Sequence, residues 1–248
     1  MYPNRRRLNY GVLACLAAVI LSSHAATPPS PRVLVFSKTA GYRHDAIPTG
    51  VEVMRKICSE NGFPMEATED ASRFTDGNLA TKEVVVFLLT TQDVLNAEQE
   101  AALVRFVRAG GGFVGIHSAA DTEYDWEWYG ELVGAYFRSH PPVQRARVVV
   151  EQPSHFTMRS LPKTSEWTDE WYDYRQNPRP RVTVLATVVE SSYTGGVMGG
   201  DHPIIWCREF DGGRSWYTGL GHTVETWNDA RFQAMLRDAI LWVARRAD

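Results

Sequence analysis

The chain has 248 residues, of which 44% are apolar and 22% charged, and its formal net charge is −3. This composition predicts a globular protein with one sizeable core and argues against a fibrous or a disordered chain. Without the three arginines of the leader described next, the formal charge is −6. That charge argues against nucleic acid and anionic membrane surfaces as partners.

Residues 1–26 are expected to form a secretory signal peptide. Three arginines at 5–7 precede an apolar run at 11–22, and small residues at 23–26 suit cleavage. The run is shorter than the roughly 20 residues that a bilayer span takes. An uncleaved anchor is the alternative. We therefore expect one domain over residues 27–248, exported to the periplasm or secreted, with no membrane contact after the leader is cleaved.

The N-terminal half alternates predicted strands and helices. Strands are expected over residues 32–36, 64–68, 83–91 and 113–116. Pro48 suits the first turn of one helix, and Asn96 with Gln99 predicts a capping box at the start of another. The unbroken apolar run at 83–91 is typical of a strand covered on both faces. This alternation predicts an α/β fold with a parallel, doubly wound sheet.

The C-terminal half contains more strands. One helix is expected around residues 128–135, strands over 145–150, 182–189, 204–210 and 215–220, and a last helix over 229–247. Cys58 lies in a predicted helix and Cys207 in a predicted strand. Two buried thiols are therefore favoured over a disulfide.

Histidines follow several of the predicted strands. Tyr42, Arg43 and His44 lie in the loop after residue 36, His117 follows residue 116 directly, and His222 lies just beyond residue 220. Ligands of open parallel sheets bind at the carboxyl ends of the strands. We therefore expect these three histidines to converge on one cleft, although a hydrogen-bonded structural role is the alternative for each.

Carboxylates and aromatic rings form two further groups of candidates. Asp169, Glu170 or Asp201 could orient a histidine and raise its basicity. Flat rings suit the C–H faces of sugars. A solvated loop is the alternative for the acids, and ordinary core packing is the alternative for the rings. The aromatic candidates are Tyr124, Tyr172 and Trp206.

Several cofactor motifs are absent from the sequence. It contains no P-loop, no HExxH and no GxGxxG placed between a predicted strand and the helix that follows it, so no nucleotide or dinucleotide cofactor is predicted. Histidines with carboxylates can hold a divalent ion, but their spacings here match no recognised metal signature. Metal dependence is therefore left open.

Several long motifs resemble the ThuA-like (trehalose-utilisation) family. They are GYRHD at 41–45, GGGFVGIHSAADTEYDWEWYGELVG at 110–134, DEWYDY at 169–174, GDHPIIW at 200–206 and GRSWYTGLGHT at 213–223. The resemblance spans residues 32–246. It implies a three-layer, flavodoxin-like fold of the class I glutamine amidotransferase superfamily, and a role in carbohydrate use with 3-keto disaccharides or glycosides as substrates.

The resemblance also bears on the chemistry. Amidotransferases of that superfamily place a catalytic cysteine after a central strand, and here His117 takes that place. Glutamine hydrolysis is therefore not expected. A serine-hydrolase role for Ser118 is disfavoured because adjacent residues generally point apart.

The leading hypothesis is an enzyme that acts on a keto-sugar by acid–base chemistry, leading to isomerisation, elimination or hydrolysis. His117 is the central base or acid, His44 and His222 polarise the carbonyl or bind the ring, and Asp169 or Glu170 assists. The candidate sugar-binding residues are Tyr42, Arg43, Ser118, Asp121, Tyr124, Tyr172, Asp201, His202 and Trp206.

Two alternatives stay open. The domain could bind sugar without catalysis, or Asp121 and Glu170 could act as the carboxylate pair of a glycosidase, which needs about 5 to 10 Å between them. The expected partner is a small carbohydrate, and the sequence also leaves a homo-oligomer open.

Overall fold

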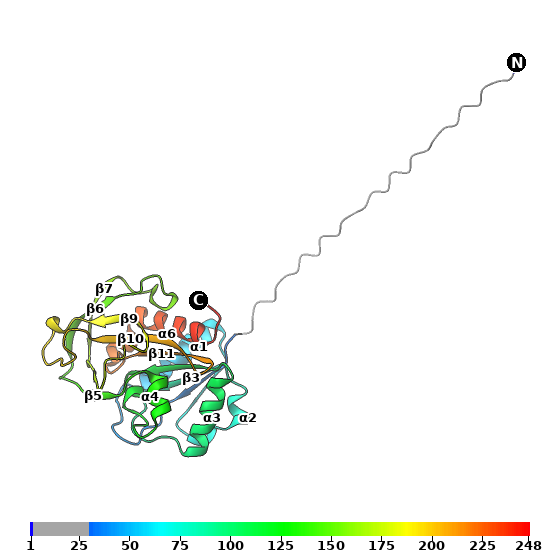
Figure 1. The fold of residues 1–248 in the computed structure, drawn as a ribbon, viewed down its shortest axis with the longest axis horizontal. Coiled ribbons are helices and arrows are strands. Elements are labelled where there is room, and N and C mark those ends of the chain that lie inside the picture. The colour runs from blue at the N-terminus through cyan, green and yellow to red at the C-terminus, as the bar shows by residue number, and fades with distance from the viewer. Residues whose placement is uncertain (2–29) are drawn as a thin grey trace.

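A computed structural model describes Met1 and residues 30–248, so the predicted leader at 1–26, apart from Met1, lies outside the described residues. One mixed sheet of nine strands dominates this part of the chain, in the order β2-β1-β3-β4-β11-β10-β9-β6-β7 (Figure 1). Its strands in that order are Met65–Thr68, Val33–Phe36, Val84–Leu88, Gly112–Ile116, Gly213–Thr218, Pro203–Phe210, Thr183–Val188, Gln144–Val150 and Thr164–Asp169.

The sheet is mixed, half parallel and half antiparallel, so the predicted parallel arrangement holds for one half of it. The four pairings from β2 to β11 are parallel, and the four from β11 to β7 are antiparallel. The change occurs where Asp211 and Gly212 join β10 to β11, with φ of 45° and 96°. Positive φ at both residues is the geometry of a two-residue hairpin turn, and such a turn makes its strands antiparallel.

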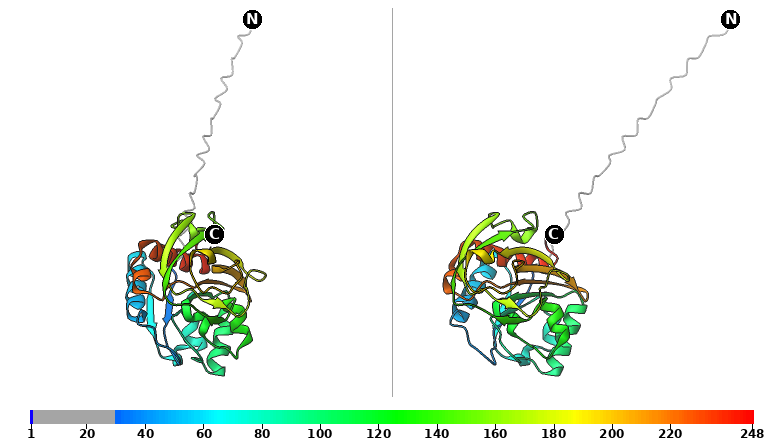
Figure 2. Two further views of the ribbon diagram at one scale, coloured as in Figure 1. Left: turned by 90° about the vertical axis from the view of Figure 1, so that its left-hand side faces the viewer. Right: turned by 60° about the vertical axis from the view of Figure 1, so that its left-hand side comes forward.

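Helices cover both faces of the sheet. β1 and β3 alternate their side chains between two apolar clusters, which explains their unbroken apolar sequences. One cluster includes α1 (Ile47–Asn61), α5 (Val224–Asn228) and α6 (Ala230–Val243). The other includes α2 (Asp76–Leu79), α3 (Ala97–Arg108) and α4 (Glu127–Val133), and Figure 2 shows these layers from two further sides. The closer likeness to flavodoxin and the amidotransferases stays a prediction.

Several short elements are not predicted by sequence periodicity. They include β7, α2, α5 and four 3₁₀ turns. They also include two short strands that pair with each other, β5 (Phe137–Ser139) and β8 (Asp173–Tyr174). The turns are η1 (Ala71–Arg73), η2 (His117–Asp121), η3 (Phe156–Met158) and η4 (Glu190–Ser192).

Two local predictions are confirmed. Asn96 caps α3, and Gln99 completes the capping box through the backbone N–H of Asn96. Cys58 and Cys207 are buried free thiols. Among the described residues, no helix combines the length and the apolarity that a bilayer crossing needs.

Candidate functional site

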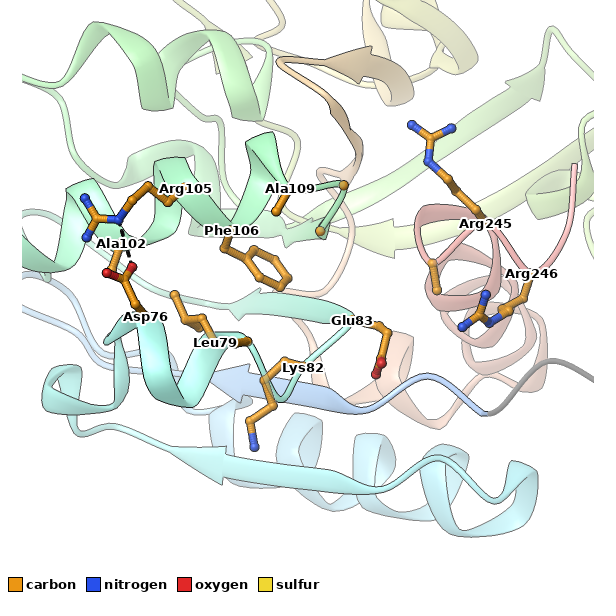
Figure 3. Close-up of a pocket in the computed structure, with 14 residues that line it drawn as sticks. Asp76, Leu79, Lys82, Glu83, Ala102, Arg105, Phe106, Ala109, Arg245 and Arg246 are labelled. Atoms are coloured by element: carbon orange, nitrogen blue, oxygen red, sulfur yellow. Dashed lines mark hydrogen bonds and ion pairs between the residues drawn. The ribbon is translucent and has the colours of Figure 1, made fainter.

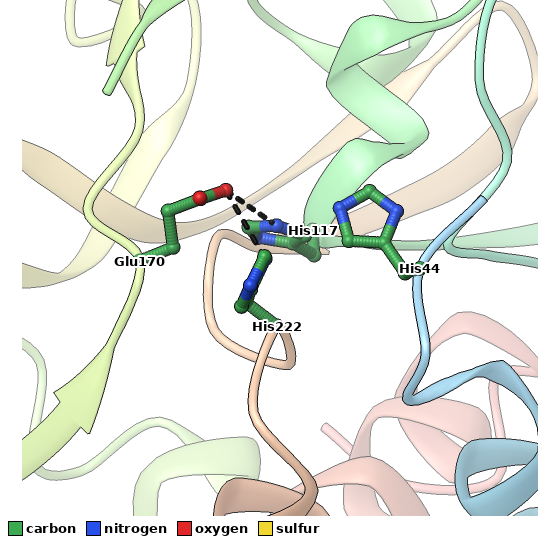
Figure 4. Close-up of side chains that lie close together, drawn as sticks. All are labelled: His44, His117, Glu170 and His222. Atoms are coloured by element: carbon green, nitrogen blue, oxygen red, sulfur yellow. Dashed lines mark ion pairs between the residues drawn. The ribbon is translucent and has the colours of Figure 1, made fainter. Parts of the chain in front are cut away.

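Four strand ends bring together three histidines and one glutamate (Figure 4). His117 follows β4, His44 lies in the loop after β1, His222 lies in the loop after β11, and Glu170 follows β7. The ring centroid of His44 lies 5.0 Å from that of His117 and 5.2 Å from that of His222, and the latter two are 5.3 Å apart. The predicted convergence of the histidines is therefore confirmed, and we call these four residues the tetrad.

Glu170 is the only carboxylate of the tetrad. Its Oε2 atom lies 3.4 Å from Nε2 of His117 and 3.1 Å from Nδ1 of His222. Its other oxygen, Oε1, lies 3.0 Å from Nδ1 of His140, a half-exposed side chain. The carboxylate therefore joins the buried imidazoles to a histidine that reaches solvent.

The ring of His117 is held in one orientation. Its Nδ1 lies 2.8 Å from the carbonyl oxygen of Gly219, and since a carbonyl only accepts, Nδ1 carries the proton. Nε2 then has a free lone pair, and this fully buried atom has no hydrogen-bond partner among the described residues. Tyr172 lies against the ring with a centroid distance of 4.0 Å. In its neutral form, His117 therefore presents a nitrogen lone pair in a fixed orientation to the tetrad.

Asp169 positions its neighbours from behind the site. This fully buried carboxylate accepts hydrogen bonds from the backbone N–H groups of Glu170, Gly221 and His222, and from the hydroxyl of Thr226. Its oxygens are therefore engaged in fixing the loops that carry Glu170 and His222. The structure places Asp169 as a positioning residue, whereas Glu170 is the carboxylate that faces the imidazoles.

The tetrad combines one anion with neutral and chargeable rings. Burial, with repulsion from His117 and His222, lowers the pKa of His44 to about 2. Burial alone would raise the pKa of Glu170, but its contacts with His117 and His222 outweigh burial and hold that pKa well below its usual range. Burial opposes charging of His222, yet Glu170 raises the pKa of that imidazole. A carboxylate anion therefore faces an uncharged His44.

Comparison of the chain with known protein families identifies the same family as the sequence motifs do. The sequence profile of ThuA, described as trehalose utilisation, matches residues 32–243. This chain belongs to the ThuA family. Membership indicates a carbohydrate-related role. No curated protein shows significant sequence similarity to the chain.

Solved structures of ThuA-like proteins share the fold. One from Bacteroides uniformis is 24% identical, with a TM-score of 0.72 over 94% of this chain and 95% of that one. Another from Parabacteroides merdae is 18% identical, with a TM-score of 0.76 over 88% and 91% of the two chains. A β-galactosidase from Bacillus circulans sp. alkalophilus is 15% identical, with a TM-score of 0.57, and matches 86% of this chain over 31% of its own length.

In this ThuA-family chain, more polar and aromatic side chains lie close to the tetrad. Tyr42 is 63% exposed and meets the His44 ring edge-on, with centroids 4.8 Å apart. The hydroxyl of Tyr124 donates to Asp121, and Arg175 lies over the Tyr124 ring at 4.0 Å. We call Tyr42, Asp121, Tyr124, His140 and Arg175 the rim.

His140 and Arg175 of the rim were not among the sequence-predicted site residues. His140 precedes prolines in what reads as an ordinary loop, and Arg175 lies just beyond a two-residue strand. Ser118 was predicted, and it is buried with its hydroxyl 3.5 Å from Nδ1 of His44. It therefore supports the tetrad from within the protein.

Four other predicted sugar-binding residues are engaged elsewhere. Arg43 pairs with Glu69, and Asp201 with Arg179. His202 is fully buried, and Trp206 is 1% exposed in the core with its indole N–H bonded to the Val133 carbonyl. His202 and Trp206 therefore have no surface for a sugar, because folding buries them against their neighbours. Tyr172 is also buried, and its ring packs on His117 at 4.0 Å and on His140 at 5.9 Å between centroids.

A cavity of about 640 Å³ lies at the opposite ends of the parallel strands (Figure 3). Its lining includes Lys82 and Glu83 just before β3, and Gly110 and Gly111 just before β4. It contains no residue of the tetrad. Since ligands of such sheets bind at the carboxyl ends of the strands, the tetrad and not this cavity is the candidate site.

Proposed function

We propose that this chain is an exported carbohydrate-processing enzyme that acts on sugars bearing a carbonyl group, such as 3-keto disaccharides or glycosides. One observation carries the proposal: two buried imidazole nitrogens, on His117 and His222, have no hydrogen-bond partner within residues 30–248 and lie beside the carboxylate of Glu170. Buried polar atoms without partners lower the stability of a fold, and they concentrate at functional sites. Membership of a trehalose-utilisation family supports a sugar as the ligand.

The chemistry follows from the free lone pair of His117. A carbonyl group makes the neighbouring C–H acidic, and Nε2 accepts that proton as the C–H electron pair forms the double bond of an enediolate. The negative charge moves to the carbonyl oxygen, and Glu170 stabilises the imidazolium that has formed. In an isomerisation, the proton of the neighbouring hydroxyl moves to that oxyanion, and the imidazolium returns its proton to the former carbonyl carbon. In an elimination, the β-glycosidic oxygen leaves with its bonding electron pair and takes the proton from the imidazolium.

The rim provides the groups that a sugar needs for binding. Tyr42 offers an exposed ring for the C–H face of a pyranose, and Asp121 with Arg175 offers an acceptor and donors for hydroxyls. His140, which contacts Glu170, can pass protons to solvent. The tetrad would then perform the chemistry, and the rim would bind the substrate.

The test is incubation of the protein with oxidised and unoxidised disaccharides, followed by mass spectrometry of the products. We expect conversion of the keto-sugars only, and a loss of about 10²–10⁴-fold in rate for His117→Ala, because a positioned acid or base contributes about that much. His155→Gln, at a histidine of η3 outside both the tetrad and the rim, is the matched control and should retain the wild-type rate.

Two outcomes would contradict the enzyme proposal. One is a panel of keto-glycosides that stays intact with the wild-type protein, both with and without added metal ions. The other is binding of the sugars that is unaffected by His117→Ala and never followed by a product. The second outcome would assign the chain to the alternative function, a non-catalytic sugar-binding or accessory domain.

A further inference from the structure

The donor atoms of the tetrad are arranged as the ligands of a metal ion are. One ligand atom from each of His44, His117, Glu170 and His222 can be chosen so that all lie within 4.8 Å of one another. Ligands bound at about 2.0–2.2 Å in a tetrahedron lie roughly 3.3–3.6 Å apart. Glu170 Oε2 lies 3.4 Å and 3.1 Å from the nitrogens of His117 and His222. These two separations are close to the edges of a coordination polyhedron, and the remaining ones lie within 4.8 Å.

The hydrogen bonding of His117 agrees with this arrangement. A metal-binding histidine donates its other ring N–H to a carbonyl or carboxylate, which fixes the tautomer and leaves the ligating nitrogen unprotonated. Nδ1 of His117 makes that bond to the carbonyl of Gly219 at 2.8 Å, and Nε2 is the buried atom without a partner. Nδ1 of His222 is likewise without a partner beside the same carboxylate oxygen. A cation would satisfy both nitrogens.

A second group of acids and histidine makes a useful contrast. Asp173, Glu190 and His202 also lie close together. Glu190 accepts backbone N–H groups from Met198 and Gly200, and both ring nitrogens of His202 have partners. That group is saturated by the protein and ties down the loop at 194–200, so it needs no ion.

We propose that the tetrad binds one divalent transition-metal ion through three imidazole nitrogens and the carboxylate of Glu170. The donor set selects the metal class. Three nitrogens and one oxygen suit Mn²⁺, Fe²⁺, Co²⁺, Ni²⁺ or Zn²⁺, whereas Mg²⁺ and Ca²⁺ prefer sites made of oxygen alone. Because the tetrad supplies one negative charge to a divalent ion, the bound ion would keep a net charge of +1. That charge would favour a substrate oxygen with partial negative charge.

The consequence for the sugar rests on the proposed function. A bound ion polarises a carbonyl oxygen as a Lewis acid and stabilises the negative charge that develops there. With an ion bound, the lone pair of His117 would be a metal ligand, so a rim residue would take the place of His117 as the base of the proposed function. Asp121 is the rim carboxylate that interacts electrostatically with His117.

Metal binding can be tested without any sugar. The purified protein, free of a histidine tag and treated with a chelator, is titrated calorimetrically with Zn²⁺, Mn²⁺ and Co²⁺, with Mg²⁺ as the comparison ion. We expect one equivalent of at least one transition ion to bind, and Mg²⁺ to bind at least tenfold more weakly. With Co²⁺, visible absorption bands should report nitrogen and oxygen ligands.

Variants locate the ion. His117→Ala and the nearly isosteric Glu170→Gln should each weaken binding at least tenfold, with circular dichroism verifying that both are folded. His155→Gln is the matched control, since this histidine lies at η3, outside the tetrad, and should bind the ion as the wild type does. Absence of transition-ion binding to the wild type, or binding unaffected by both tetrad variants, would overturn the proposal.

Failure of this proposal is distinguishable from failure of the proposed function. An ion bound by the tetrad with no conversion of any keto-sugar would refute the enzyme and leave the metal site standing. Conversion of a keto-sugar by protein that binds no transition ion would refute the metal site and leave His117 as the base.

Discussion

Positive φ angles collect beside the tetrad at residues other than glycine. Leu89, Gln92, His117 and Glu123 have φ between 52° and 61°, and all follow the carboxyl ends of β3 or β4. Such angles are uncommon for residues with a side chain and lower stability unless the surroundings compensate. At His117 the angle turns the chain from β4 into η2. Position 117 is not a glycine, so the sequence does not predict this positive φ.

Glu123 makes the stability of the fold depend on pH. Its buried carboxyl accepts the backbone N–H groups of Val94 and Leu95, but burial prevails and raises its pKa to about 7. From about pH 4.5 to 7 the native state keeps this proton while the unfolded chain loses it, so stability falls as pH rises. Glu123→Gln keeps the acceptor without the charge. The unfolding free energy of Glu123→Gln minus that of the wild type should therefore increase by roughly 1–3 kcal/mol from pH 5 to pH 8.

Urea denaturation at several pH values measures this difference. Glu98→Gln, at an exposed position in the first turn of α3, controls for the substitution itself. A gap between Glu123→Gln and wild type that stays constant with pH, or that grows equally for Glu98→Gln, would contradict the assignment.

Among the elements, the contact between α1 and α5 fixes the loop that carries His222. Gly50 of α1 faces the indole of Trp227, which is fully buried in α5. The indole N–H donates to the carbonyl of Gly221, the residue before His222, at 2.7 Å. Helix packing therefore determines where the last strand-end histidine lies.

Gly50→Ala tests this contact. Alanine ordinarily stabilises a helix by about 1 kcal/mol relative to glycine. Here the new Cβ would lie 2.9 Å from a carbon of Trp227, so we expect a net destabilisation of about 1–3 kcal/mol. Gly77→Ala in α2 is the control, because its Cβ meets nothing within 4 Å and should be neutral or stabilising. Equal stabilisation of both variants in urea denaturation would show that the contact is unimportant.

At the element scale, local patterns predict regular segments well and irregular ones poorly. The apolar runs of β1, β3 and β4 and the capping box of α3 are local features, so the sequence indicates them directly. β7 alternates exposed and buried residues from Thr164 to Asp169, a pattern typical of a half-buried strand. Of its buried residues only Trp167 is apolar, so the sequence shows no apolar–polar alternation that would have placed Asp169 and Glu170 at a strand end.

At the scale of the whole molecule, a half-buried ion pair joins the antiparallel half to a helix on the parallel half. Asp238 of α6 is fully buried and accepts two hydrogen bonds from Arg159, which follows η3 between β6 and β7. Arg237 provides a second cation on the same carboxylate. Removal of Arg159 would leave the buried charge partly uncompensated.

We therefore expect Arg159→Ala to lose about 1–3 kcal/mol of unfolding free energy. Arg105→Ala breaks an exposed pair with Asp76 and should change stability by less than about 1 kcal/mol. Thermal unfolding followed by both tryptophan fluorescence and circular dichroism measures the loss. An effect of Arg159→Ala no larger than that of Arg105→Ala would refute the structural importance of this link.

The sequence by itself determined the family, the alternating elements of the parallel half and the histidines that follow its strands, because each is a pattern of neighbouring residues. Tertiary structure alone decided that Glu170 faces those histidines while Asp169 lies behind them, and that Trp206 belongs to the core. The members of the tetrad lie on four loops spread from residue 44 to residue 222. Their distances depend on strand order and register, which are set by pairing between remote segments and not by local periodicity.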